Sequence, residues 1–153
     1  MALLNIVKEG DPILRKTSRP IEQITPRITT LLDDMLETMR AANGCGLAAV
    51  QVGVLRRVVI IEVEDGVVYE MINPRIVFRA GKQEEQEGCL SVPGKWGITT
   101  RPARVTVRYT DREGRERDLK GEGLLARAIC HELDHLDGKL FTDVVIRYIH
   151  DEE

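Results

Sequence analysis

The chain has 153 residues and a mass of 17.2 kDa, a length that fits one domain with a substantial buried core. Apolar residues make up 42% and charged residues 31%, which is typical of a globular protein and excludes wholesale disorder. The net charge of −3 gives no basic excess that would indicate nucleic-acid binding, and no apolar run is long enough for a membrane helix.

The first predicted element is an amphipathic helix over about residues 26–42. Thr25 suits the N-cap, and Pro26 suits the first helical position. Apolar residues recur at three- and four-residue steps through this segment, which predicts one core-facing stripe. Asn43 and Gly44 then supply the stop signal.

The middle of the chain predicts strands. These segments are rich in β-branched residues or alternate between apolar and polar residues, as half-buried strands do. Glu64-Asp65-Gly66 is a hairpin turn signal between the first two strands, and a second turn is expected over residues 111–114. The predicted strands span residues 57–63, 67–72, 75–79, 103–109 and 115–119.

A second helix is predicted over about residues 123–137, with Gly138 as its left-handed stop. Its wide apolar face predicts that most of it is buried. Residues 141–146 are expected to form a final strand or an extended tail. The predicted fold class is α+β, with mostly antiparallel strands packed around this central helix and the amphipathic helix near the N-terminus, in a single domain over residues 1–153.

The strongest local signal is His131-Glu132-Leu133-Asp134-His135 in the second helix. Side chains at i and i+4 share one face of a helix, with their Cβ atoms about 6 Å apart, so two imidazoles can reach one metal ion. Glu132 is rotated by about 100° from His131 and can reach a water beside the ion rather than the ion itself. The alternative is a pair of helical histidines that only pack and hydrogen-bond.

A catalytic metal needs a third protein ligand and keeps its fourth position for water. The candidates for this ligand are the three cysteines and the carboxylates. Three cysteines are an odd number, which argues against a disulfide framework. Cys130 points about 100° away from His131 and is expected to be a small buried apolar residue. Cys45 and Cys89 both lie in glycine-bearing segments, predicted as loops, that permit close approach. Spacing alone favours Cys89 only slightly over Cys45.

Gln51 is the polar side chain in an otherwise small and apolar stretch, residues 44–53. Two interpretations are open: a solvent-facing or turn-capping amide, or a donor aimed at a developing oxyanion. A dinucleotide-binding loop is disfavoured, because the Gly-x-Gly sequence follows a helix instead of preceding one.

Three stretches together resemble the peptide deformylase family. The signatures of this family are Gly-x-Gly-Leu-Ala-Ala-x-Gln, Glu-Gly-Cys-Leu-Ser and His-Glu-x-x-His, and they stand complete and in that order at residues 44–51, 87–91 and 131–135. The resemblance covers essentially the whole chain, including the early segment 11–15. Two positions depart from many family members: Val50 replaces proline, and Cys130 replaces glutamine.

The resemblance implies removal of the formyl group from the N-terminal formyl-methionine of newly made polypeptides, with release of formate. It assigns Cys89, His131 and His135 to one divalent metal ion. This donor set suits Zn(II), Fe(II), Co(II) or Ni(II), and the family characteristically uses Fe(II) in cells, whereas purified protein can carry zinc or nickel. Glu132 is implied to move the proton, and the Gln51 amide and the Leu90 backbone N–H to bind the oxyanion.

The substrate is expected to lie beside this metal. The resemblance implies that Gly46 binds the formyl region or the peptide backbone. The methionine needs an apolar pocket, and helix geometry nominates residues one and two turns before His131, namely Leu124, Arg127 and Ala128. Arg127 is unexpected there, and either lines a wall with its aliphatic stem or faces water outright.

The expected partners are formyl-methionyl nascent peptides and, transiently, the ribosome, with no direct nucleic-acid binding and no membrane. Family members often dock on ribosomes through a basic C-terminal helix, but this sequence ends on Asp151, Glu152 and Glu153. His150 in this tail is expected to be solvated. Without a visible signal peptide, and with free thiols that need a reducing compartment, the chain is expected in the cytoplasm.

Two other functions remain open. One is an endopeptidase of the His-Glu-x-x-His type, which usually places a third His or Glu ligand downstream, where little of the chain remains here. The other is a non-enzymatic domain with structural zinc, for which a fourth donor such as Cys45 would have to join the site.

Overall fold

The computed structural model describes residues 2–149, which form two antiparallel sheets and two α-helices. The helices are α1 (Pro26–Ala41) and α2 (Leu124–Leu136), and the 3-10 turns are η1 (Pro12–Arg15), η2 (Ala49–Val52) and η3 (Phe141–Asp143). The strands are β1 (Gly46–Ala48), β2 (Val58–Glu64), β3 (Val67–Ala80), β4 (Gln83–Cys89), β5 (Val92–Arg101), β6 (Arg104–Thr110), β7 (Glu116–Glu122) and β8 (Val145–Ile149).

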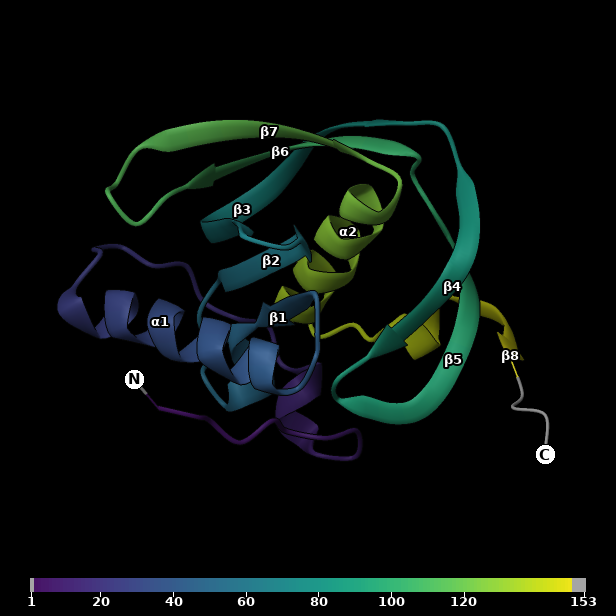
Figure 1. Ribbon diagram of the computed structural model, residues 1–153, viewed down its shortest axis with the longest axis horizontal. Coiled ribbons are helices and arrows are strands. Elements are labelled where there is room, and N and C mark those ends of the chain that lie inside the picture. The colour runs from purple at the N-terminus through teal and green to yellow at the C-terminus, as the bar shows by residue number, and fades with distance from the viewer. Residues whose placement is uncertain (1, 150–153) are drawn as a thin grey trace.

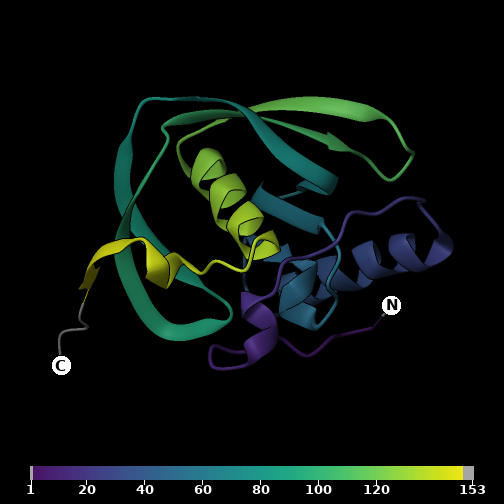
Figure 2. The same cartoon turned by 180° about the vertical axis from the view of Figure 1, so that it is seen from behind.

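Helix α2 lies between the two sheets. The larger sheet has the order β1-β2-β3-β6-β7 and the smaller one β4-β5-β8, and all neighbouring strands are antiparallel. Figure 1 shows β4 and β5 on one side of α2 and the larger sheet around the other, with α1 packed beside β1 and β2. The reverse view in Figure 2 shows η3 and β8 crossing beside β5. The α+β class with antiparallel sheets agrees with the prediction.

Helix α1 forms where the periodicity predicts it, to within one residue at its end. Pro26 occupies the first turn and Thr25 is the N-cap, although the Thr25 side chain makes no capping hydrogen bond. The apolar stripe, which includes Leu32, Met35 and Met39, is buried against the larger sheet. No helix in the described part of the chain is long and apolar enough to cross a membrane.

The predicted hairpin is confirmed, but the strand after it is longer than expected. Gly66 turns the chain between β2 and β3 with a φ of 84°. Residues 75–79 are not a separate strand, because β3 continues through Asn73 and Pro74. Asn73 adopts a φ of 53°, and the pairing register with β6 shifts between Ile72 and Arg75. This irregularity accommodates a proline that a regular ladder would exclude.

The smaller sheet was not predicted. Strand β4 has the sequence QEEQEGC, which carries neither alternation nor β-branched residues, and its position is set by pairing with β5. Cys89 is therefore the last residue of a strand rather than part of a loop. The end of the chain also differs from the expectation, since residues 141–143 form η3 and the final strand β8 starts only at Val145.

Most residues of helix α2 are buried, as its wide apolar face predicts. It begins at Leu124 after Gly123 and ends before Gly138, whose φ of 77° confirms the predicted left-handed stop. A Cβ at Gly138 would also come within 2.4 Å of the Arg15 carbonyl oxygen, so only glycine fits there. The buried residues of α2 are Ala126, Ala128, Ile129, Cys130, His131, Glu132, Leu133, His135 and Leu136.

Candidate active site

Three potential metal ligands converge where the end of β4 meets α2. One donor atom each from Cys89, His131 and His135 lies within 4.8 Å of the others. The Cys89 Sγ and the His135 Nε2 are 3.3 Å apart. A single turn of α2 separates the two histidines, so the helix presents both rings on the face toward Cys89. Of the two cysteines that spacing left open, the structure brings Cys89 to the histidines.

A buried carboxylate orients His131. The Nδ1 of His131 lies 2.5 Å from Glu87 Oε2. The imidazole ring therefore donates its Nδ1 proton to Glu87, and this turns its Nε2 toward Cys89. Burial disfavours the charged form of Glu87, but the hydrogen bonds from His131 and Arg101 outweigh it and lower the pKa of Glu87 to about 2. Glu87 is therefore ionised, and it fixes the orientation of the ring in the way that carboxylates do for metal-binding histidines.

Glu87 is held by a network of its own. Arg101 donates to both carboxylate oxygens, at 2.7 and 3.2 Å, and Thr99 Oγ1 donates at 2.7 Å. Arg101 also donates to Asp134 Oδ2 at 2.7 Å, which links β5 back to α2. Sequence reasoning missed the role of this network. Glu87 lies inside a recognised motif, but no spacing pattern identifies its partners Thr99 and Arg101.

The two histidines sit in different electrostatic surroundings. Burial together with the neighbouring His131 lowers the pKa of His135 well below its usual value, so this ring is neutral, as metal binding requires. Burial also disfavours a charged His131, but the carboxylates of Glu132 and Glu87 and the Cys89 sulfur raise its pKa. These anionic surroundings favour a positive charge beside His131, and a metal ion would supply one.

Glu132 lies next to the cluster. It is buried, and its Oε1 has no hydrogen-bond partner within the described residues. Burial raises the pKa of Glu132 to about 7. A Cβ on Gly46 would come within 2.5 Å of Glu132 Oε2, so the glycine lets β1 pass directly against this carboxylate. An oxygen left unpaired beside potential metal ligands is placed to bind a water.

Gln51 caps a turn and also directs its amide toward the cluster. Its side chain is 1% exposed, which excludes a solvent-facing amide. Oε1 accepts the Ala48 N–H at 2.9 Å and so caps η2, while Nε2 donates to Ser91 Oγ at 3.0 Å and points at Cys89 Sγ, 3.6 Å away. The amide donor is thus held rigidly at the cluster. Leu90, which directly follows Cys89, is half-buried and packs against Gly44.

A cleft of about 390 Å³ opens onto these residues. The predicted residues Gly46, Leu124, Arg127 and Ala128 all line it, and so does Trp96, which was not predicted. Arg127 is half-buried, so it does not face water outright. A larger groove of about 800 Å³ lies beside α1, but none of the potential ligands lines it.

The other two cysteines do not join the cluster. Cys130 is buried, and burial raises the pKa of its thiol to about 11, as fits a small apolar residue. Cys45 is exposed and lines the cleft, but the cluster found among residues 2–149 contains only Cys89 and the two histidines. A closed site with four protein ligands is therefore not formed by the described residues. His150 and the acidic residues 151–153 lie outside them.

The comparisons with known proteins agree with one another. The family model described as polypeptide deformylase matches residues 3–149. Curated peptide deformylases from Acetivibrio thermocellus and Caldanaerobacter subterraneus are 58% and 54% identical over all of this chain, which spans 89% and 96% of their lengths.

Solved structures give the same result. A peptide deformylase from Legionella pneumophila has a TM-score of 0.92 and 42% identity, with 94% of this chain and 86% of that chain covered. One from Ehrlichia chaffeensis in complex with actinonin has a TM-score of 0.93 and 42% identity, covering 95% and 90%. Because the family model matches nearly the whole length of the chain, the chain belongs to the polypeptide deformylase family.

Proposed function

We propose how the residues of this chain carry out the reaction of its family, the removal of the N-formyl group from the formyl-methionine of newly made polypeptides with release of formate. Residues 1–153 act as a single catalytic domain. Helix α2 is its central metal-binding helix and supplies His131, His135 and Glu132, while the end of β4 supplies Cys89.

Cys89, His131 and His135 would hold one divalent ion. The 3.3 Å between Cys89 Sγ and His135 Nε2 is close to the roughly 3.5 Å expected for sulfur and nitrogen ligands that share a tetrahedral ion. One thiolate with two imidazoles suits Fe(II), Zn(II), Ni(II) or Co(II) rather than Mg(II), and we propose Fe(II) in cells. When bound, such an ion lowers the pKa of a water toward 7 and polarises a carbonyl.

We assign the proton transfer in this reaction to Glu132. Its unpartnered Oε1 is buried beside the ligand cluster, where it could accept a hydrogen bond from a water that the ion would bind. The carboxylate takes the proton of the attacking water and later delivers it to the leaving amine. Burial keeps bulk water away from this exchange.

The remaining residues bind the substrate. The formyl oxygen gains negative charge as its carbon becomes tetrahedral, and the Gln51 Nε2 and the Leu90 backbone N–H donate to it. Gly46 lets the peptide approach Glu132 closely, since any side chain at this position would fill the space. Leu124 and Ala128 give the methionine side chain an apolar wall.

The observation that carries this function is the convergence of Cys89, His131 and His135 in a cleft beside Glu132. The test is formate release from a formyl-methionyl tripeptide by anaerobically prepared protein, with and without a chelator. Glu132→Gln should keep its metal and lose turnover by several orders of magnitude, because the proton has no carrier. Glu122→Gln, in exposed β7, is the matched control. Turnover that survives chelation, or an active Glu132→Gln, would contradict the proposal.

We place the reaction in the cytoplasm, where newly made polypeptides appear and where the three free cysteines stay reduced. Contact with the ribosome is then proposed to be transient. Co-sedimentation of the protein with translating ribosomes tests this contact, and a stable stoichiometric complex would contradict it.

A further inference from the structure

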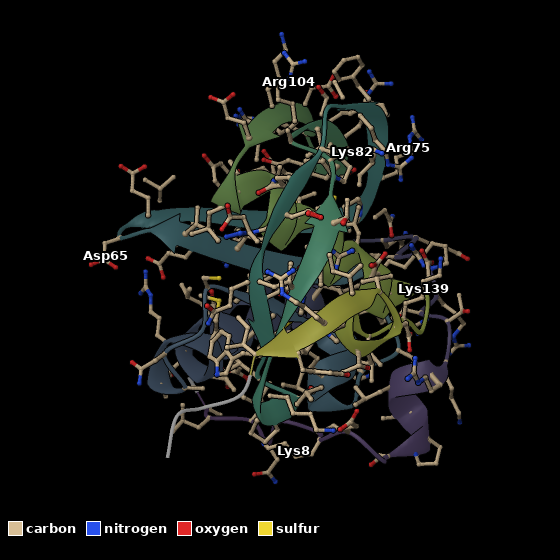
Figure 3. All side chains as sticks on the ribbon, turned by 90° about the vertical axis from the view of Figure 1, so that its right-hand side faces the viewer. Lys8, Asp65, Arg75, Lys82, Arg104 and Lys139 are labelled. Atoms are coloured by element: carbon tan, nitrogen blue, oxygen red, sulfur yellow. The ribbon has the colours of Figure 1, made fainter. Side chains whose placement is uncertain are left out.

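Arg127 introduces a charge into the wall of the cleft. It lies on α2 one turn before His131, between the apolar positions Leu124 and Ala128. Other basic side chains are exposed, for example Lys8, Lys82, Arg104 and Lys139, and Figure 3 shows Arg104 and Lys8 at opposite edges of the molecule. Arg127 is instead half-buried along the cleft.

The charge of Arg127 is not compensated within the described residues. No hydrogen bond or ion pair joins its guanidinium to another side chain of residues 2–149, whereas the other cation of the cleft wall, Lys95, lies 3.3 Å from Glu9. The acidic groups of the cleft are Glu87, which Arg101 neutralises, and the buried Glu132. Glu84 and Glu85 on β4 do not line the cleft.

Arg127 lines the same cleft as Cys45, which directly precedes β1. Burial and then the negative charge of Glu132 raise the pKa of the Cys45 thiol, and the charges of His131 and Arg127 act in the opposite direction. Arg127 and Cys45 both line the cleft, so Arg127 borders the space that a bound peptide would fill. A partly desolvated arginine forms strong, often bidentate hydrogen bonds with a carboxylate.

We propose that Arg127 is a specificity-determining residue that favours nascent peptides with Asp or Glu at one of the first two positions after the formyl-methionine. The inference rests on the proposed function, because the methionine must occupy the apolar wall for the following residues to reach Arg127. The carboxylate binds away from the reacting carbonyl, so it is bound equally in the ground state and the transition state. The preference therefore appears mainly in KM.

The test compares formyl-Met-Asp-Ala and formyl-Met-Ala-Asp with their Asn counterparts. Wild-type protein should prefer at least one acidic peptide by about three- to tenfold in kcat/KM, the range for a partly exposed ion pair. Arg127→Gln should reduce the ratio to about one, and Arg127→Glu should reverse it in favour of the Asn peptides. Ratios are taken within each variant, so a general loss of activity cancels.

Lys139→Gln is the matched control, because it removes the same charge outside the cleft and should keep the wild-type ratio. A wild-type ratio of one, or a ratio unchanged in Arg127→Gln, would overturn the inference while formate release from the Asn peptides still supported the proposed function. If no formyl peptide is hydrolysed, both fail. A fall in kcat on the Asn peptides with KM unchanged in Arg127→Gln would show that Arg127 acts in catalysis rather than in specificity.

Discussion

The side chains around His131 form a continuous chain of charges, from Asp134 through Arg101 and Glu87 to the imidazole. Arg101 and Glu87 are both buried, and isolated buried charges of this kind would be costly. Each charge here has a partner of opposite sign at hydrogen-bond distance. The network therefore holds one ring of the proposed metal site in a single orientation.

Removing the charge of Glu87 should weaken metal binding. Glu87→Gln leaves an amide that cannot accept from His131 and Arg101 as a carboxylate does, and loss of such a partner typically reduces metal affinity about 10–100-fold. Affinity is measured by competition with a chromophoric chelator, with Glu84→Gln in the exposed part of β4 as the control. Equal affinities in wild type and Glu87→Gln would show that the network serves stability alone.

Among the elements, those with local periodicity were predictable and those held by distant partners were not. Helices α1 and α2 carry their stripes and stop signals within their own sequence. Strand β4 carries no such pattern. Its backbone is held by pairing with β5, and its Glu87 is held by Thr99 and Arg101, which lie 12 and 14 positions later in the sequence. For the same reason, the motifs gave the proposed ligands and Glu132, but not Thr99 or Arg101.

The end of α1 is tied to the β2–β3 hairpin by one carboxylate. Glu62 accepts two hydrogen bonds from Arg40, both at 2.8 Å, and one from the Gly66 N–H at 2.9 Å. The bonds from Arg40 and then from Gly66 lower the pKa of Glu62 to about 2. A pKa that is lower in the folded state stabilises the fold above the ordinary carboxyl pKa, and this contribution is lost as the pH falls toward 2.

The free-energy cost of Glu62→Gln should therefore depend on pH. We expect the variant to be less stable than wild type at pH 6, and the difference to shrink steadily from about pH 4.5 downward as the wild-type carboxylate becomes protonated. Urea unfolding at pH 6 and pH 3.5 measures both differences. Glu64→Gln, an exposed carboxylate in the same hairpin, is the control. A difference that stays constant or grows on acidification would refute the role given to Glu62.

For the molecule as a whole, the arrangement of the two sheets places the site. The larger sheet packs along α2 and presents Gly46, and the turn η2, which follows β1, presents Gln51. The smaller sheet brings Cys89 and the Glu87 network to the same helix. The site is complete only when both sheets contact α2 (Figure 1). Sequence motifs far apart along the chain thus become neighbours through the packing around one helix.

The ligand set of the proposed metal site is measured most directly by X-ray absorption spectroscopy at the metal edge of protein loaded with Co(II) or Zn(II). The proposed ligand set predicts one sulfur near 2.3 Å, two imidazole nitrogens near 2.0–2.1 Å and one further light atom. Cys89→Ser should remove the sulfur, whereas Cys45→Ser should leave the spectrum unchanged. A spectrum with no sulfur, or with two, would contradict the ligand set on which the proposed function rests.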